Sequence, residues 1–188
     1  VADADAVEAA AARVEAELGP IDIWVNNAMT SVFSPISQMT ADEFRRVTEV
    51  TYLGCVYGTI SALRRRRERD AGTIIQIGSA LAYRSIPLQS AYCAAKAAVG
   101  AITRCLAVEW AAKGISVVDV APGYIETDLN RAALTQNPLK DFLARRIPTG
   151  GPANADAIAK MVAAIYSENI RFLNGETIYV DGGQGIAH

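Results

Sequence analysis

The stretch Thr73-Ile-Ile-Gln-Ile-Gly-Ser79 gives the clearest indication of the fold of this chain. It is short, apolar and rich in β-branched residues, which is typical of a strand buried on both faces of a parallel sheet. Two further runs have the same character, Ile21-Asp-Ile-Trp-Val-Asn-Asn-Ala28 and Ile115-Ser-Val-Val-Asp-Val-Ala-Pro-Gly123. All three end in small or polar residues, as expected where a doubly wound sheet has its ligand crevice.

Helical patterns alternate with these runs. Gly19-Pro20 ends an alanine-rich helix, and Thr40 with Glu43 three residues later predicts a capping box at the start of another. Ser90 is the expected N-cap of the next long helix. The expected helices cover about 5–18, 40–67, 90–113 and 154–167, the last opened by Asn154, and a final strand covers 176–180 after an irregular segment at 123–153.

This alternation predicts an α/β fold, a Rossmann-like doubly wound parallel sheet of about four strands with flanking helices. The chain has 188 residues, of which 51% are hydrophobic and 20% charged, so it has enough apolar material for one core. No repeat or low-complexity linker divides it. We therefore expect 1–188 to form a single domain.

Composition disfavours several classes of function. A net charge of −2 gives no reason to expect a nucleic-acid partner, and no run of 18 uninterrupted apolar residues predicts a membrane span. The one histidine is the terminal His188, which argues against a Ser-His-Asp hydrolase and a histidine-ligated zinc, so no metal is expected. Three cysteines without a C-x-x-C pair suit a reducing compartment, and we expect a cytoplasmic protein.

Tyr92 and Lys96 carry the strongest chemical signal, in Ser-Ala-Tyr-Cys-Ala-Ala-Lys. Residues four apart on a helix point along the same face, so the ammonium can sit against the phenol and favour its ionised form. The pKa of a tyrosine, ordinarily ~10, would then move towards neutrality. Ser79 ends a neighbouring strand and could hold a substrate oxygen beside the phenol. The pair also occurs by chance on many helices, so the surrounding motifs decide its meaning.

These surroundings resemble the short-chain dehydrogenase/reductase family. The motifs that match, in the family's order and spacing, are Asn26-Asn27-Ala28, Ser79, Tyr92-x-x-x-Lys96, Pro122-Gly-Tyr-Ile-Glu-Thr127 and Asp181-Gly-Gly183. They extend over essentially the whole chain, and together they are far more specific than any one of them. The run from Val120 to Leu129 resembles 3-oxoacyl-carrier-protein reductase-like members.

The resemblance implies an oxidoreductase that transfers a hydride between NAD or NADP and a small-molecule carbonyl or alcohol substrate. It implies that Tyr92 exchanges a proton with the substrate oxygen, that Lys96 lowers the pKa of Tyr92 and binds the nicotinamide ribose, and that Ser79 orients the oxygen. The implied cofactor-binding residues are Asn26, Ala28, Tyr92, Lys96, Pro122, Gly123, Ile125 and Thr127. Members of the family pair through two long helices, so a homodimer or homotetramer is also implied.

Three departures from the family keep an alternative open. The turn T-G-x-x-x-G-x-G, with which the family cradles the cofactor pyrophosphate, does not occur in these residues. Met29 stands where the family usually has Gly, and Thr51 stands where it has Asn. That Asn acts largely through its main-chain carbonyl, which a threonine keeps, so Thr51 is the expected fourth catalytic residue. The alternative is a non-catalytic Rossmann-like remnant that acts as a binding or assembly module.

The absent turn also predicts that these residues are the C-terminal portion of such a domain, which is then incomplete at its N-terminus. In the resembled fold the strand at 21–27 is central, and its neighbour on one side comes from the portion before Val1. We therefore expect this strand to lie unpaired on one side or to pair with another chain.

Overall fold

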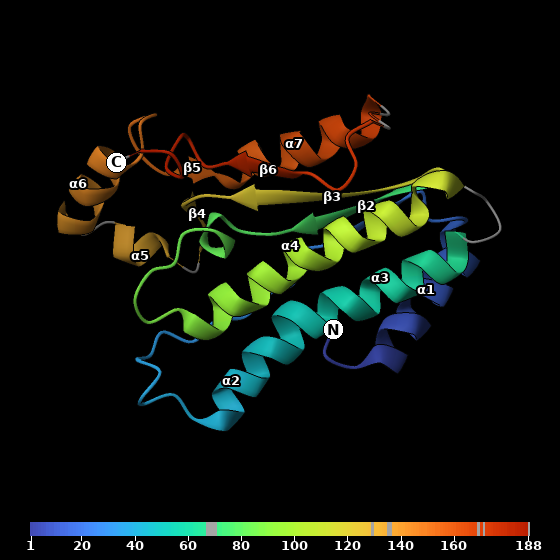
Figure 1. Cartoon of the computed structure of the whole chain (residues 1–188), viewed down its shortest axis with the longest axis horizontal. Helices are drawn as coiled ribbons and strands as arrows, with labels where there is room; N and C mark the ends of the chain where they lie inside the picture. The colour runs from blue at the N-terminus through green and yellow to red at the C-terminus, as the bar shows by residue number, and fades with distance from the viewer. Residues whose placement is uncertain (67–70, 129, 135–136, 169, 171, 188) are drawn as a thin grey trace.

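The computed structural model describes the chain except for residues 67–70, 129, 135–136, 169, 171 and 188. Its centre is a four-stranded parallel sheet with the strand order β1-β2-β3-β6 (Figure 1). The strands are β1 (Ile23–Asn26), β2 (Gly72–Ile77), β3 (Ile115–Pro122) and β6 (Thr177–Val180). The predicted α/β fold with about four parallel strands is confirmed.

Helices connect the strands much as the sequence predicts. The long helices are α1 (Ala4–Leu18), α2 (Ala41–Thr48), α3 (Gly54–Arg66), α4 (Ser90–Trp110) and α7 (Ala155–Ser167). One turn of π-helix, η1 (Glu49–Leu53), joins α2 to α3, so the expected single helix contains a local change of winding. Short 3₁₀ turns, η2 (Ala80–Ala82) and η3 (Ala111–Lys113), precede and follow α4. The predicted end of the second helix, at 67, lies outside the described residues.

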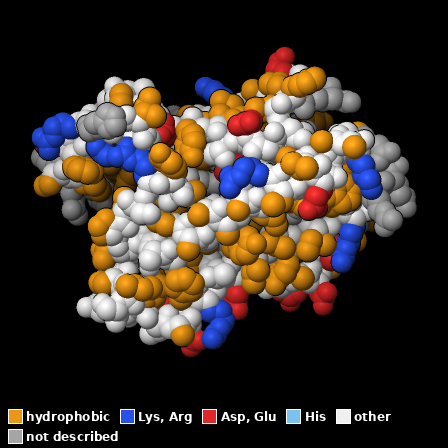
Figure 2. Space-filling model, viewed as in Figure 1, with side chains coloured by type: hydrophobic (Ala, Val, Ile, Leu, Met, Phe, Trp, Pro, Cys, Tyr) orange, Lys and Arg blue, Asp and Glu red, His pale blue; other side chains and the backbone are white. Residues whose placement is uncertain are grey.

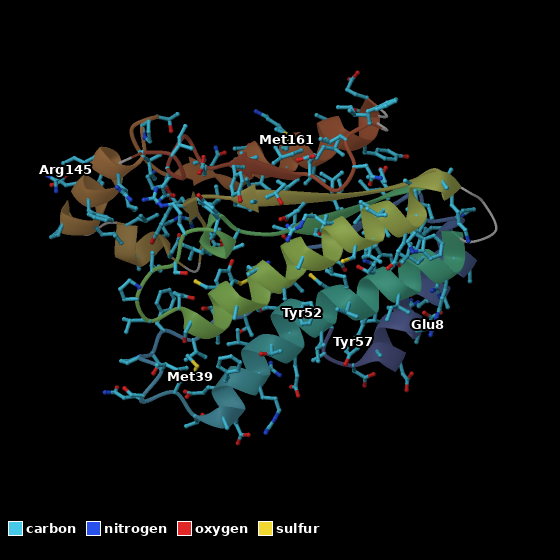
Figure 3. All side chains as sticks on the ribbon, viewed as in Figure 1. Glu8, Met39, Tyr52, Tyr57, Arg145 and Met161 are labelled. Carbon is cyan, nitrogen blue, oxygen red and sulfur yellow. The ribbon has the colours of Figure 1, made fainter. Side chains whose placement is uncertain are left out.

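The sheet is covered on both faces. Figure 1 shows α3 and α4 along one face and α7 along the opposite one. On the α4 side Ile74 and Val117 are fully buried against Ala62 and Ala107, whereas on the α7 side Ile75 and Val118 pack with Ile165. Met161, labelled on α7 in Figure 3, adds to the second cluster. Adjacent residues of β2 and β3 therefore face opposite cores, which explains their unbroken apolar sequences.

Two of the predicted helix starts have the expected chemistry. The Thr40 side chain accepts the amide of Glu43, and the Glu43 carboxylate accepts the amide of Thr40, so the capping box is confirmed. Asn154 caps α7 by accepting the amide of Ala157. The prediction for Ser90 is wrong by one residue, because Gln89 holds the N-cap position without a side-chain cap bond.

The segment 123–153 is more ordered than the sequence predicts. It contains a two-stranded parallel ladder of β4 (Ile125–Glu126) and β5 (Ala153–Asn154), with α5 (Arg131–Leu134) and α6 (Asn137–Arg146) between them. Strands of two residues are too short to show a period of two, so pattern reading could not find them. Pro138 lies in the first turn of α6, where a proline needs no intrahelical partner for its nitrogen. Arg145 marks α6 at the side of the molecule in Figure 3.

The edge strand β1 is less well covered than the central helix α4. Within the described residues β1 pairs with β2 on one side and forms the edge of the sheet, and its Val25 is 39% exposed. By length and composition alone the helix Ser90–Lys113 could cross a membrane, but half of its apolar window is buried inside the fold. Its packing on β3 is that of a core helix.

Candidate active site

The carboxyl ends of the parallel strands meet at one edge of the sheet, and Ser79 lies there directly after β2. Its backbone is extended and its side chain is largely buried. The hydroxyl accepts a hydrogen bond from the amide of Leu81 at 3.1 Å, which caps η2 and fixes the orientation of the side chain. A serine hydroxyl that accepts one bond still has its proton to donate.

Tyr92 and Lys96 project from the first two turns of α4. The Lys96 side chain is 1% exposed, and its Nζ lies 5.8 Å from the centre of the Tyr92 ring. The ammonium donates a hydrogen bond to the carbonyl of Ile77, at the end of β2. An ammonium has three donors, so two remain for other partners. The structure therefore brings Lys96 and Tyr92 together as their spacing predicts.

The environment of Tyr92 sets its proton affinity. Burial raises the pKa of its phenol above the ordinary value, while the nearby hydroxyl of Ser79 lowers it. The net direction is opposite to the lowering expected from Lys96, because the loss of water outweighs the other contributions in this arrangement. The contribution of Ser79 indicates that its hydroxyl lies near the Tyr92 phenol.

Thr51 lies in the π-helical turn η1 and is fully buried. Its hydroxyl accepts the amide of Thr30 at 3.0 Å and donates to the carbonyl of the same residue at 2.8 Å. Thr51 therefore anchors the segment that follows β1 to the helix that passes above it. Tyr52, the next residue, is labelled in Figure 3 between α2 and α3 and shows where this turn lies. Single π-helical turns are frequent at functional sites.

The side chain of Asn26 lies in the interior of the fold. Its side chain is 8% exposed, and its amide nitrogen donates to Thr59 at 3.0 Å and to Gln76 at 2.9 Å. Its amide oxygen accepts the indole N–H of Trp24 at 2.8 Å. The side chain is therefore committed to the interior, which leaves the main chain of Asn26 to face a ligand. Ala28 and Met29 follow in an exposed segment.

The residues after β3 are held by the C-terminal turn and by one asparagine. Gly123 donates to the carbonyl of Val180, and a Cβ at this position would lie 2.6 Å from the Cβ of Asp181. Asn130 donates to the carbonyl of Ile125 and accepts the amide of Thr127, both at 2.8 Å. Pro122 ends β3 next to these groups. Asn130 thus fixes the predicted cofactor-binding residues 125 and 127, although the motif does not include it.

This geometry agrees with the comparisons, and the chain belongs to the short-chain dehydrogenase/reductase family. A family model described as Enoyl-(Acyl carrier protein) reductase matches residues 1–184. Members of the family that resemble this chain are NAD(P)-dependent dehydrogenases and reductases that act on carbonyl or hydroxyl groups.

Among individual relatives, the chain is 37% identical over 173 residues to an acetoacetyl-CoA reductase of Shinella zoogloeoides, covering 92% of this chain and 71% of that protein. It is 36% identical over 184 residues to a 3-oxoacyl-(acyl-carrier-protein) reductase of Salmonella typhimurium, covering 97% and 74%. A gluconate 5-dehydrogenase from Burkholderia cenocepacia, crystallised with NADP and tartrate, is 33% identical with a TM-score of 0.94, covering 100% and 73%.

The residues at this edge fit the nicotinamide half of such a cofactor. Lys96 Nζ, which lies 5.8 Å from the centre of the Tyr92 ring, keeps two donors that suit the hydroxyls of a ribose. Ala28 and Thr127 are exposed on segments that follow β1 and β3, so this edge is accessible. The glycine-rich turn that would cradle the pyrophosphate does not occur in the 188 residues.

Two buried residues near the site were not singled out from the sequence. Gln76 bonds to Asn26 and Thr59 beneath the strand ends, and Asp119 is a carboxylate that is 1% exposed. Both lie inside apolar strand sequences, where a lone polar residue is the available signal. What surrounds them depends on tertiary packing and could not be inferred from the strand sequence.

Proposed function

We propose that this chain transfers a hydride between NAD or NADP and a carbonyl or alcohol substrate, with Ser79, Tyr92 and Lys96 as its catalytic residues. The observation that carries the proposal is the position of Lys96. Its Nζ lies 5.8 Å from the centre of the Tyr92 ring and donates to the carbonyl of Ile77, two residues before Ser79. The names of the relatives support the reaction class. A nicotinamide cofactor, when bound, supplies or accepts the hydride.

The protein side of the reaction is a proton transfer at one oxygen. The Tyr92 hydroxyl protonates the oxygen of a ketone as it becomes an alcohol, and removes that proton in the reverse direction. The Ser79 hydroxyl donates to the same oxygen and holds it beside the phenol. The Lys96 ammonium stabilises the ionised phenol by its charge and donates to the ribose hydroxyls.

We assign the remaining contacts by position at the same edge. When the cofactor is bound, the main chains of Asn26 and Ala28 would hold the ribose together with Tyr92 and Lys96 from α4. Pro122, Gly123 and Ile125 would bind the nicotinamide, and Thr127 would bind its amide or the phosphates. The Thr51 main-chain carbonyl continues the proton path from Lys96 through a water molecule. This assignment includes no metal, nucleic-acid or membrane contact. We also propose a cytoplasmic protein, because its three cysteines, without a C-x-x-C pair, suit a reducing compartment.

The experiment is a Tyr92→Phe substitution, assayed for hydride transfer with NADH and NADPH against a panel of ketones and alcohols. General acid–base catalysis contributes about 10²–10⁴ in rate, so activity should fall by at least ~100-fold while the fold stays intact. Tyr83→Phe is the matched control, because it removes the same hydroxyl from a tyrosine that directly follows η2 and is 77% exposed. If Tyr92→Phe retains more than about a tenth of the activity, the proton donor is misassigned.

Met29, which stands where the family usually has glycine, favours a second candidate, a non-catalytic binding or assembly module. Such a module would bind neither NADH nor NADPH tightly, whereas the enzyme binds at least one. Calorimetry with both nucleotides separates the two. Lys96→Met should weaken binding in the enzyme, and Tyr92→Phe should leave binding nearly unchanged.

A further inference from the structure

Four polar side chains form a row across the sheet. Asn26 of β1 pairs in register with Gln76 of β2, Gln76 with Asp119 of β3, and Asp119 with Thr177 of β6. Thr59 on α3 bonds to Asn26 and Gln76 from above. The row therefore lies on the face covered by α3 and α4, between the apolar core and the carboxyl edge.

Asp119 is the charged member of this row, and its surroundings are shaped around it. One carboxylate oxygen accepts the hydroxyl of Thr177 at 3.2 Å, and the other has no hydrogen-bond partner among the described residues. A Cβ at Gly78 would lie 2.2 Å from that oxygen, and one at Gly100 would lie 3.7 Å from the second. Gly78 thus leaves room for the carboxylate, whereas a Cβ at Gly100 would make ordinary contact with it. The burial of this carboxylate is costly unless an opposite charge compensates it.

The opposite charge comes from Lys96. Gly100 lies one turn after Lys96 on α4, so both face the same part of the sheet. The Lys96 ammonium donates to the carbonyl of Ile77, and the unpartnered oxygen of Asp119 lies against Gly78, the next residue. The ammonium and the carboxylate therefore reach adjacent residues at the end of β2.

Other ionisable groups facing this place do not supply a negative charge. Burial raises the pKa of the Cys55 thiol on α3, so this group is neutral near pH 7. Burial also raises the pKa of Tyr179 on β6, and Arg104 on α4 is a cation. Burial lowers the pKa of Lys96, and the charges of Cys55 and Asp119 oppose that change. Burial raises the pKa of the Asp119 carboxyl group, while the hydroxyl of Thr177 and the charge of Lys96 oppose that change. With the thiol neutral, Asp119 is the group here that can supply the negative charge.

We propose that Asp119 is a positioning residue for the reaction, a buried counter-charge that keeps Lys96 in its ammonium form. An uncharged Lys96 could not stabilise the phenolate of Tyr92, so the value of Asp119 for catalysis rests on the proposed function. The effect of Asp119 on the protonation of Lys96 does not depend on the proposed function. Asp119 touches neither substrate nor cofactor in this scheme and acts through the lysine.

The test reads the proton on Lys96 directly. The chain has four lysines, Lys96, Lys113, Lys140 and Lys160, so their ε-carbon signals can be followed separately by NMR in isotopically labelled protein. Asp119→Asn keeps the shape and removes the charge, and the pKa of Lys96 should fall by about one unit, a tenfold change in its ammonium-to-amine ratio. An unchanged Lys96 titration overturns the proposal.

A matched control separates charge from packing. Thr103→Val removes a buried polar group from α4, the helix that carries Lys96, without changing the charge. Lys96 should therefore titrate as in the wild type. If Asp119→Asn does not fold, Asp119→Val replaces the charge by an apolar group of similar size and should give the same shift. The NMR signal of the Asp119 carboxyl carbon can also be titrated in the wild-type protein, without any substitution. A carboxyl group that is neutral at pH 7 overturns the proposal.

The pH dependence of activity gives a second test, because a purely structural role of Asp119 would leave this dependence unchanged. In Asp119→Asn the alkaline limb of the pH–rate profile should move to lower pH by about one unit, because Lys96 loses its proton earlier. An unmoved limb in an active variant counts against the proposal. If the wild type proves inactive, the proposed function fails, and the NMR titration still decides the role of Asp119.

Discussion

At Gly123 a side chain has no room. A Cβ there would lie 2.6 Å from the Cβ of Asp181 and 2.7 Å from its Cα, and backbone atoms cannot swing away as a flexible side chain can. We expect Gly123→Ala to lower the free energy of unfolding by about 1–3 kcal/mol, as overpacking does, and to weaken nucleotide binding at the same edge. Urea unfolding and calorimetry measure the two effects.

Gly100 is the matched control for that substitution. It lies inside α4, and the nearest atoms to a Cβ there are 3.7 Å away, which is ordinary contact. Gly100→Ala should therefore raise the free energy of unfolding by about 0.5–1 kcal/mol, since alanine loses less conformational freedom in a helix. Equal destabilisation by both substitutions would contradict the steric argument for Gly123.

Residues with a local signature were predictable, and residues defined by their neighbours were not. The spacing of Tyr92 and Lys96 is a property of one helix, so the sequence predicts their proximity. The side-chain amide of Asn26 bonds to Trp24 and to Gln76. Gln76 lies 50 residues further along the chain, so this contact depends on the register between β1 and β2. Asp119 looks like one polar residue in an apolar strand until α4 is placed over it.

At the scale of the element, Thr51 joins the π-helical turn η1 to the segment that follows β1. Thr51→Val keeps the branched shape but removes both hydrogen bonds to Thr30, which leaves two backbone groups without a partner. We expect a loss of about 2 kcal/mol in the free energy of unfolding and weaker nucleotide binding, because the segment after β1 loses its anchor. Urea unfolding and calorimetry check this.

Thr48→Val is the control for that prediction. The Thr48 hydroxyl bonds to the carbonyl of Phe44 within its own helix, which has another partner there, so its removal should cost less than about 0.5 kcal/mol. Thr51→Ser should retain both bonds and lie between the wild type and Thr51→Val. A Thr51→Val protein as stable as Thr48→Val would show that the anchor is unimportant.

The outer face of α4 supports self-association. Val108 is 83% exposed, Ile60 on α3 is 42% exposed, and Figure 2 shows hydrophobic side chains gathered over the region of these helices. Towards the N-terminal end of α4 lies a hollow of about 500 Å³ whose lining includes Leu88 and Ala97. Exposed apolar surface of this kind is typical of a protein interface. We expect a dimer through α3 and α4, measured by light scattering at micromolar concentration.

Val108→Glu should shift that equilibrium towards the monomer, because a carboxylate would be buried at the centre of the interface. Val14→Glu on α1 is the control, since Val14 is 41% exposed and lies on another helix. A wild-type monomer at micromolar concentration would contradict the prediction. So would equal effects of the two substitutions.

Elements were predictable where their residues form an apolar run, a helical period or a cap. The runs that became β2 and β3 and the capping box at Thr40 have such local signals. The pair β4 and β5 does not, because two residues per strand gain their partners from the tertiary fold. The π-helical turn between α2 and α3 was not predictable from the sequence either, because its residues continue the helical pattern.

At the scale of the whole molecule, the open side of β1 is the least protected part of the sheet. In the described residues β1 pairs with β2 alone, and Val25, an apolar residue of a parallel strand, is 39% exposed. Parallel strands are normally buried on both faces, and an unpaired apolar edge favours aggregation. We therefore expect β1 to gain a partner strand in the functional protein, as the motif pattern also predicts.

Amide hydrogen exchange tests this expectation residue by residue. In the 188-residue chain as a monomer, the amides of Ile23–Asn26 that point away from β2 should exchange much faster than those of Gly72–Ile77, because water reaches them directly. In a polypeptide with further residues before Val1 that supply the neighbouring strand, the same amides should become protected by at least ~100-fold, since exchange then requires opening of the sheet. Amides of Gly72–Ile77 serve as the internal control and should change little. Full protection of every β1 amide in the monomeric chain would show that this edge is already satisfied, and the expectation of a further strand would fail.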